Sequence, residues 1–324
     1  MQESCSESFW HKLGLVYCAS GESDWMCSRA FLPTPILLNK DVVRVYSTFL
    51  DEDDIGRTGY VDVSAQDPTH IIKISDTPCL DKGEPGSFDD SGVTASCIIH
   101  VDGKQYMYYQ GWQRLHFVPY NIFSGLAVSE DGGETFAKIQ KCPILDRIET
   151  QQNIRSAPFV LKDDRDWMLW SCSGSGFKDV KSRPLPVYGI SCSMSASAVS
   201  FPSEPTWCIY PEKDQDDIYG YARPWVIKKN GVFLIWYSER SASKIYRSKF
   251  AISRDGMNWK ACDDKFSVQP SMSGWDSEMV AFSAVIETDY GTYMFYNGNG
   301  CGTSGFGVAK LTVNNLDHLI QVAG

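Results

Sequence analysis

The sequence predicts an all-β fold, a five-bladed β-propeller in which an N-terminal strand closes the last blade. Two observations lead to this prediction. Helical periodicity is almost absent, and short apolar runs alternate with turns rich in Gly, Asp, Asn and Ser. In addition, an aromatic strand with a polar exit recurs every ~60 to 67 residues, a period that suits one four-stranded blade. The five copies lie at residues 42–46, 106–109, 167–170, 233–237 and 293–296.

Each aromatic strand has the same neighbours in the sequence. An apolar strand and a turn precede it, and a third strand that starts near a small residue follows it. We therefore expect a single domain over residues 1–324, with blades at roughly 28–80, 88–145, 153–210, 219–268 and 276–313. The last blade has only three strands of its own, so we expect residues 10–18 to supply the fourth strand and protect both open edges.

The third strand of two blades runs into a recognisable turn. Residues 129–136 match the Asp-box pattern S-x-D-x-G-x-T-[WF], residues 253–259 are a looser copy, and residues 193–201 are a degenerate third. In such a hairpin, Asp and Ser side chains bond the turn amides and Gly adopts a positive φ, while the aromatic residue packs back on the blade. We expect these turns to be structural, and they are not evidence of catalysis.

Composition argues against several classes of function. The formal net charge is −10 and Lys and Arg form no basic stripe, so nucleic acid is not an expected partner. Residues 1–10 lack the apolar segment of a signal peptide, and no apolar run approaches ~18 residues, so no membrane span is expected. The 11 cysteines include no CxxC pair and lie mostly in apolar runs, which favours a reducing, cytoplasmic location.

No cofactor is indicated by the sequence. The His residues show no ligand spacing, so no metal site is expected, and there is no Gly-rich phosphate loop or dinucleotide fingerprint. These patterns leave open an oxygen-ligated cation in the central channel, and they do not address the oligomeric state.

The expected topology gathers polar residues on one face. The first strand of each blade lines the central channel of a propeller, so the approach to strand 1 and the exit from strand 2 lie at the same end. Converging charges, amides and aromatic rings at a channel mouth predict a ligand site there. The approaches contribute Arg29, Asp89, Asp90, Arg155, Tyr221, Arg223, Asp276 and Glu278, and the exits contribute Trp112, Glu239, Arg240, Asn297 and Asn299.

Several segments carry a resemblance to known proteins: residues 33–35, 86–93, 108–112, 129–136, 222–224, 274–279 and 296–300. With these segments the chain resembles five-bladed glycosidase clans that include arabinanase/xylosidase-like, invertase-like and mannoside-phosphorylase-like enzymes. It is most similar to bacterial glycosyl-hydrolase-like proteins associated with surface-polysaccharide synthesis. The chain departs from that group at Arg29 and Phe31, where the group tends to have His and Gln. It also lacks a complete match to the three-carboxylate set of the arabinanase-like enzymes.

The resemblance implies chemistry at a glycosidic bond. That reaction needs an acid that protonates the leaving oxygen and a second carboxylate that acts as base or nucleophile. Glu278 is the expected acid, because it follows Trp275 and enters an apolar strand, where desolvation would raise its pKa. Asp90, or Asp89 beside it, is the expected partner carboxylate. A separation of about 5 to 10 Å between the carboxyl groups of Asp90 and Glu278 would fit this chemistry, and carboxylates locked in salt bridges would count against it.

Arginine and aromatic side chains are expected to bind the substrate. Arg155 and Arg223 would hold charged or hydroxyl-rich groups with forked donors, and Trp112 and Tyr221 would stack on sugar faces. Together with Arg29, the two arginines suit an anion, either a carboxylate as in sialidases or a phosphate as in phosphorylases. An acidic or phosphorylated sugar is therefore expected. The predicted substrate-binding set is completed by Glu239, Asp276, Asn297 and Asn299.

A different class of function stays open at this point. A non-catalytic carbohydrate-binding propeller would also explain the incomplete carboxylate set. The expected partner is a carbohydrate in either case. A cytoplasmic protein would handle a nucleotide- or lipid-linked sugar during synthesis rather than degrade a polymer outside the cell.

Overall fold

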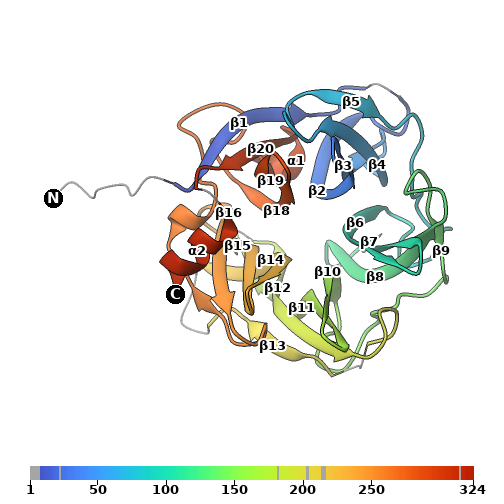
Figure 1. The fold of residues 1–324 in the computed structure, drawn as a ribbon. Helices are drawn as coiled ribbons and strands as arrows, with labels where there is room; N and C mark the ends of the chain where they lie inside the picture. Colours follow the sequence, from blue (N-terminus) through green and yellow to red (C-terminus); the bar gives the residue numbers. More distant parts are fainter. Residues whose placement is uncertain (1–7, 22, 181, 202–203, 213–216, 314) are drawn as a thin grey trace.

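The protein is built almost entirely of β-strands arranged around a centre (Figure 1). The computed structural model describes residues 8–21, 23–180, 182–201, 204–212, 217–313 and 315–324. The helical elements within these residues are short, namely the 3₁₀ turn η1 (Asp264–Phe266), α1 (Asn299–Gly302) and α2 (Leu316–Ala323). No helix in this part of the chain has the length and apolar character needed to cross a membrane. The prediction of an all-β chain is thus confirmed.

The strands form antiparallel meanders that follow one another along the sequence. The first contains β2 (Ser28–Asn39), β3 (Val42–Leu50), β4 (Gly56–Ser64) and β5 (Ile71–Ile74). The next contains β6 (Val93–Val101), β7 (Lys104–Arg114), β8 (Tyr120–Ser129) and β9 (Ala137–Lys138). It is followed by β10 (Ile154–Asp163), β11 (Asp166–Asp179), β12 (Pro184–Ser195) and β13 (Thr206–Ile209), and then by β14 (Ile218–Lys229), β15 (Val232–Ser241), β16 (Ile245–Ser253) and β17 (Lys260–Ala261). The last contains β18 (Ala281–Thr288), β19 (Gly291–Asn297) and β20 (Phe306–Leu311).

Neighbouring meanders are connected in two ways. Short parallel pairings between β8 and β10 and between β12 and β14 join the three middle meanders into one extended sheet. The last meander receives its fourth strand from the N-terminal region, because β1 (Trp10–Tyr17) pairs antiparallel with β20. Lys12 on β1 also forms a 2.6 Å ion pair with the buried Asp276 carboxylate. These contacts bring the two ends of the described chain into one sheet.

The strands nearest the centre, β2, β6, β10, β14 and β18, share one backbone irregularity (Figure 1). In each of them the register with the following strand shifts near the start of the strand. Such a shift marks a β-bulge, which bends a strand and redirects a side chain. In four of these strands a shift contains a residue with a positive φ that also faces the centre, although side chains other than glycine rarely adopt this region: Leu32 (59°), Ala157 (47°), Arg223 (53°) and Phe282 (56°). All four of these residues line one small cavity, so the repeated bulges shape the centre of the molecule.

The turn at residues 129–136 is held by its own polar side chains. The Asp131 Oδ1 atom accepts hydrogen bonds from the amides of Glu134 and Thr135 at 3.1 and 3.0 Å, and the Ser129 hydroxyl accepts one from the Gly133 amide at 2.8 Å. The turn at residues 253–259 is closed in the same way by Ser253 and Asp255. Neither turn contributes to the pockets near the centre.

An ion-pair cluster connects the first of these turns to the first meander. Arg44 on β3 is 1% exposed and forms a bidentate pair with Asp62 on β4, at 2.7 and 2.9 Å. Its guanidinium also bonds to the Glu134 carboxylate at 2.6 Å and lies 3.6 Å from the Tyr60 ring centroid. Glu134 additionally receives hydrogen bonds from Tyr60 and from Lys73. The cluster therefore adds charged contacts to the apolar packing that also joins these two meanders.

This cluster predicts a pH-dependent stability. Burial alone would raise the pKa of Glu134, but hydrogen bonds from Tyr60, Arg44 and Lys73 outweigh it and lower the pKa to about 2. An unfolded Glu titrates near ~4.3. The ionised Glu134 carboxylate therefore stabilises the fold fully above about pH 4.3, and this contribution is lost as the pH falls toward 2. We expect the stability difference between the wild type and Glu134→Gln, measured by urea unfolding, to be largest above pH 5 and to shrink progressively below pH 4.

A variant at a carboxylate outside the cluster provides the control. Glu149 is exposed in a different loop, so Glu149→Gln should follow the wild-type curve at every pH. A Glu134→Gln difference that stayed constant from pH 6 to pH 3 would show that the ionised carboxylate is not what stabilises the fold.

Candidate functional site

A cavity of about 400 Å³ opens at one end of the centre. It is lined by the starts of innermost strands, the ends of second strands and the starts of third strands, which meet at the same end of their meanders. We call it the arginine pocket, because three arginines from different meanders line it. Its lining residues are Arg29, Phe31, Thr48, Leu50, Asp54, Gly56, Ser91, Gly92, Thr94, Trp112, Arg114, Pro119, Tyr120, Arg240, Tyr246, Phe282 and Cys301.

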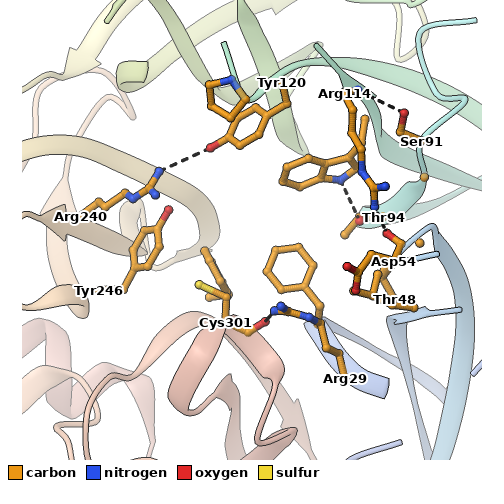
Figure 2. Close-up of a pocket in the computed structure, with 17 residues that line it drawn as sticks. Arg29, Thr48, Asp54, Ser91, Thr94, Arg114, Tyr120, Arg240, Tyr246 and Cys301 are labelled. Carbon is orange, nitrogen blue, oxygen red and sulfur yellow. Dashed lines mark hydrogen bonds between the residues drawn. The ribbon is translucent and has the colours of Figure 1, made fainter. Parts of the chain in front are cut away.

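Arg240, at the end of β15, is surrounded by tyrosines. Its Nη1 atom donates to the Tyr188 hydroxyl at 3.1 Å and lies 3.5 Å from the Tyr120 hydroxyl. Its guanidinium carbon is 5.1 and 5.3 Å from the ring centroids of Tyr219 and Tyr246. Within the described residues no carboxylate pairs with Arg240, and its buried Nε atom has no partner. Neutral hydroxyls and rings thus orient a positive charge without neutralising it (Figure 2).

Arg29 and Arg114 approach the pocket from other directions (Figure 2). Arg29 lies within the first register shift of β2, has a positive φ of 66°, and donates to the backbone carbonyls of Gly300 and Cys301 at 2.8 and 3.2 Å. Arg114, at the end of β7, donates to the carbonyls of Asp53 and Asp54. Neither guanidinium forms an ion pair with a carboxylate in the described part of the chain. All three arginines are therefore held by neutral acceptors, and their charges remain available to a ligand.

Asp54 is the one acidic side chain among the described residues that line the pocket. It lies in the loop between β3 and β4, is exposed and has a positive φ of 59°. Figure 2 shows it beside Arg114 and Thr48, across the cavity from Arg240. Three arginines against one aspartate give this lining a formal charge of +2, in a chain whose net charge is −10. The lining of the pocket is therefore positively charged in a protein whose net charge is negative.

Aromatic rings form the walls between these charges. The Trp112 indole donates to the Thr94 hydroxyl at 3.1 Å, which fixes the orientation of the ring. Phe31 packs edge-on against Trp112 and Phe282, with centroid distances of 6.2 and 5.2 Å, and Tyr120 packs against Trp112 at 5.3 Å. Pockets that combine apolar ring surfaces with a few convergent polar groups are typical of small-molecule sites.

A metal centre is not indicated in the described residues. No group of three or more His, Cys, Asp or Glu side chains is placed to hold an ion there. The positive charge of the arginine pocket would also repel a cation.

Comparisons with other proteins define the relatives of the chain. No family model matches it. The uncharacterized protein Rv1502 of Mycobacterium tuberculosis strain H37Rv is 30% identical over 302 residues, which cover 93% of this chain and 99% of that protein. The uncharacterized protein MT1551 of strain CDC 1551 matches with the same identity and coverage. The chain belongs to the Rv1502 family.

Solved structures show which fold this member of the Rv1502 family has. A glycoside hydrolase superposes with a TM-score of 0.70 at 16% identity, covering 94% of this chain and 92% of its own. A thermostable family-43 glycoside hydrolase gives 0.64 at 16% identity over 87% of both chains. A structure from the GH130 family of mannoside phosphorylases, described with hydrolases of β-1,2 mannosidic linkages in Candida mannan, gives 0.68 at 15% identity over 95% of both chains. The fold is therefore of the propeller type that these enzymes share.

The carboxylates expected to be catalytic do not line the arginine pocket. Asp89 is 2% exposed, pairs with Lys138 at 2.6 Å and accepts from the Tyr109 hydroxyl at 3.1 Å. Asp90 accepts from the Gly86 amide and the Ser91 hydroxyl. Asp89 is thus engaged in a salt bridge, and Asp90 in the hydrogen bonds of its own loop.

Glu278 also differs from its expected environment. Its side chain is exposed, although Met279 and Val280 after it are buried. Its backbone amide donates to Asn299, and its carbonyl accepts from Arg247. The desolvation on which its assignment as an acid depended is therefore absent in this structure.

The predicted arginines separate into different environments. Arg29 lines the arginine pocket. Arg155 is 4% exposed, donates to the carbonyl of Asp146 at 2.8 Å and lies outside this pocket. Arg223 is 1% exposed and lines the smaller cavity at the centre. The structure therefore does not bring the three expected arginines together, and it places Arg114 and Arg240 beside Arg29 instead.

Most of the other predicted residues have structural contacts. Trp112 does line the arginine pocket, whereas Tyr221 is buried and packs edge-on against Tyr237 at 5.6 Å. Asp276 is paired with Lys12 as described above. Fully buried Asn297 accepts from the Leu32 amide and donates to the carbonyl of Ala30, each at 2.7 Å. The remaining two residues lie outside the pocket lining: Glu239 is 3.8 Å from Lys249, and Asn299 bonds the amide of Glu278.

The residues that sequence reasoning missed share one position in the repeat. Asp54 lies in a connection between a second and a third strand, Arg114 ends a second strand at such a connection, and Tyr120 and Tyr246 lie at the starts of third strands. An antiparallel meander returns to the same end at this connection, so its residues belong to the same face as the approaches to strand 1. A search of these connections for charged and aromatic residues would have found them.

Proposed function

We propose that the protein binds an anionic saccharide in the arginine pocket and acts on its glycosidic bond by phosphorylase-like chemistry. The observation that supports this proposal is the convergence of Arg29, Arg114 and Arg240, none of which pairs with a carboxylate in the described residues. A phosphate or carboxylate group can accept charged hydrogen bonds from several guanidinium forks at once. The rings of Phe31 and Trp112 would then face the sugar.

The number of carboxylates favours phosphorolysis over hydrolysis. Hydrolysis of the usual kind needs two carboxyl groups near the bond, and the described lining of the pocket provides Asp54 alone. In phosphorolysis, inorganic phosphate is the nucleophile, so one acid suffices. The carbon–oxygen bond to the leaving group breaks, a carbon–oxygen bond to phosphate forms, and the Asp54 carboxyl group gives its proton to the leaving oxygen. This scheme requires no metal cofactor.

A non-catalytic carbohydrate-binding function is the second candidate. It is favoured by the exposure of Asp54, because a carboxyl group that faces solvent is not enclosed beside the bond it would cleave. Both candidates share the same ligand and the same pocket, and turnover distinguishes them.

We further propose that each meander is one blade of a five-bladed propeller and that residues 1–324 form a single domain. The pairing of β1 with β20 and the recurrence of the bulge support this arrangement. The proposed blades cover residues 28–80, 88–145, 153–210, 219–268 and 276–313, with residues 10–18 in the last.

The cellular setting is also a proposal. Cys79, Cys97 and Cys172 are buried and form no disulfide, which supports a cytoplasmic location. A nucleotide- or lipid-linked sugar, used in surface-polysaccharide synthesis, would carry a phosphate group that the arginines of the pocket can bind.

The test combines binding with turnover. Isothermal titration of the full chain with neutral, carboxylated and phosphorylated sugars should show binding of the anionic members, and incubation with inorganic phosphate should release a sugar 1-phosphate. Asp54→Asn should abolish release while changing affinity little, because it removes the proton donor and keeps the side-chain shape. Anionic binding without any turnover would select the binding function, and equal affinity for neutral and anionic sugars would refute both.

A further inference from the structure

A second cavity of about 60 Å³ adjoins the arginine pocket at the centre of the molecule. The two cavities share the side chains of Phe31, Trp112, Tyr120, Tyr246 and Phe282. The rest of the inner lining is buried and includes the bulge residues Leu32, Ala157 and Arg223. No Asp or Glu is among the described residues that line it. The inner cavity is thus a small, mainly apolar space with one cationic side chain.

That cation, Arg223, is only partly satisfied by the protein. It is 1% exposed, and its two terminal nitrogens donate across the centre to the carbonyls of Ser96 and Pro33 and to the Thr34 hydroxyl. These acceptors are neutral, and no carboxylate pairs with Arg223 in the described chain. Its Nε–H group has no partner. Burial lowers the pKa of Arg223 to about 9, so the side chain is still charged at neutral pH.

A second unsatisfied donor lines the same cavity. Gln110, on β7, is 4% exposed, and its Nε2 atom has no hydrogen-bond partner. A buried amide without a hydrogen-bond partner is destabilising, and a buried charge without a counter-ion is more so. Arg223 and Gln110 come from different meanders, yet both line this one cavity, and each has a buried donor without a partner. The hydrogen bonds across the centre satisfy the terminal nitrogens of Arg223, but the Nε atom of Arg223 and the Nε2 atom of Gln110 remain without an acceptor.

We propose that the inner cavity binds a halide-sized inorganic anion, held by the side chains of Arg223 and Gln110. A monovalent anion supplies both the negative charge and the acceptor that the lining lacks. The volume fits, because one water-sized species needs about 10–15 Å³ of such space, whereas the cavity has about 60 Å³. The space is too narrow for a saccharide, which distinguishes this site from the adjoining pocket. The proposed anion site does not depend on which ligand the arginine pocket binds.

Bromide provides the direct test. Crystals of the full chain soaked in sodium bromide should show one anomalous scattering peak within hydrogen-bonding distance of Arg223 and Gln110. In solution, thermal unfolding is measured at constant ionic strength while gluconate is replaced by chloride or bromide. Stabilisation by a ligand that binds only the folded state grows with the logarithm of the ligand concentration above Kd. We therefore expect the wild-type Tm to rise in proportion to the logarithm of the halide concentration.

Variants separate a specific site from general salt effects. In Gln110→Leu the halide concentration needed for a given rise in Tm should be at least tenfold higher than in the wild type. Gln152→Leu, which replaces an exposed glutamine elsewhere, should match the wild type. Arg223→Met should remove the effect if it folds, but the conclusion rests on Gln110. An empty or water-filled cavity in bromide-soaked crystals would overturn the proposal. So would a halide effect that is equal in Gln110→Leu and the wild type.

Discussion

Arg240→Met is expected to weaken binding of a phosphorylated sugar by about 10- to 150-fold. A hydrogen bond to a charged group contributes about 1.5–3 kcal/mol, and each 1.4 kcal/mol corresponds to a factor of ten in Kd. Methionine retains the length of the side chain among the surrounding tyrosines and removes the charge. Titration calorimetry with a sugar phosphate, and with inorganic phosphate as the minimal probe, measures the change. The affinity of Arg240→Lys should lie between those of the wild type and Arg240→Met, because lysine keeps the charge but lacks the forked donors of a guanidinium.

The control for this prediction is an arginine of the same protein that lies elsewhere. Arg254 is exposed in the turn at residues 253–259 and is not part of the arginine pocket. Arg254→Met should therefore bind the sugar phosphate as the wild type does. Unchanged affinity in Arg240→Met, with normal thermal unfolding, would contradict the proposed anion site. An equal loss in both arginine variants would instead show that the attraction is a long-range effect of net charge.

Arg44→Met is expected to be the most destabilising of the substitutions proposed. The change leaves the Asp62 carboxylate, which is 4% exposed, without its bidentate partner. Breaking a buried pair on one side costs about 3–5 kcal/mol, because an uncompensated charge stays buried. Urea unfolding of the variant should therefore show a strongly reduced midpoint with little change in slope.

A second substitution tests the physical reason for this loss. In Arg44→Met combined with Asp62→Asn the buried charge is removed as well, so part of the lost stability should return. Lys104→Met, which breaks an exposed pair with Glu130, should leave the midpoint unchanged because such pairs contribute little. A midpoint for Arg44→Met as high as that of Lys104→Met would show that the cluster is not stabilising.

The repeating strands could be read from the sequence because local patterns encode them. The apolar and aromatic runs that predicted strands at residues 42–46 and 233–237 lie within β3 and β15. Strand alternation depends on neighbouring residues, so one sequence is enough to recognise it. The bulges were not predicted. Ala157 and Arg223 adopt positive φ values that neither residue favours by itself, and the surrounding sheet imposes them.

The end of the molecule at which arginines and aromatic rings gather was easier to predict than the residues that line the cavity there. Arg29, Trp112 and Arg240 lie on the expected face and line the pocket. Glu278 and Asp89 come from the same kind of segment, but one is exposed and the other is paired with Lys138. Whether a carboxylate faces solvent, a lysine or a cavity depends on contacts between distant segments, and sequence spacing does not contain that information.

The position of Arg29 has a consequence for how the protein is made. Its guanidinium is held by the carbonyl of Gly300, which follows 271 positions later in the chain. During synthesis the N-terminal meanders leave the ribosome before the C-terminal ones. The arginine pocket is therefore incomplete until the segment around Gly300 and Cys301 has emerged. A ligand of this pocket can stabilise the finished chain, but it gives no support to a shortened translation product, which remains exposed to proteases.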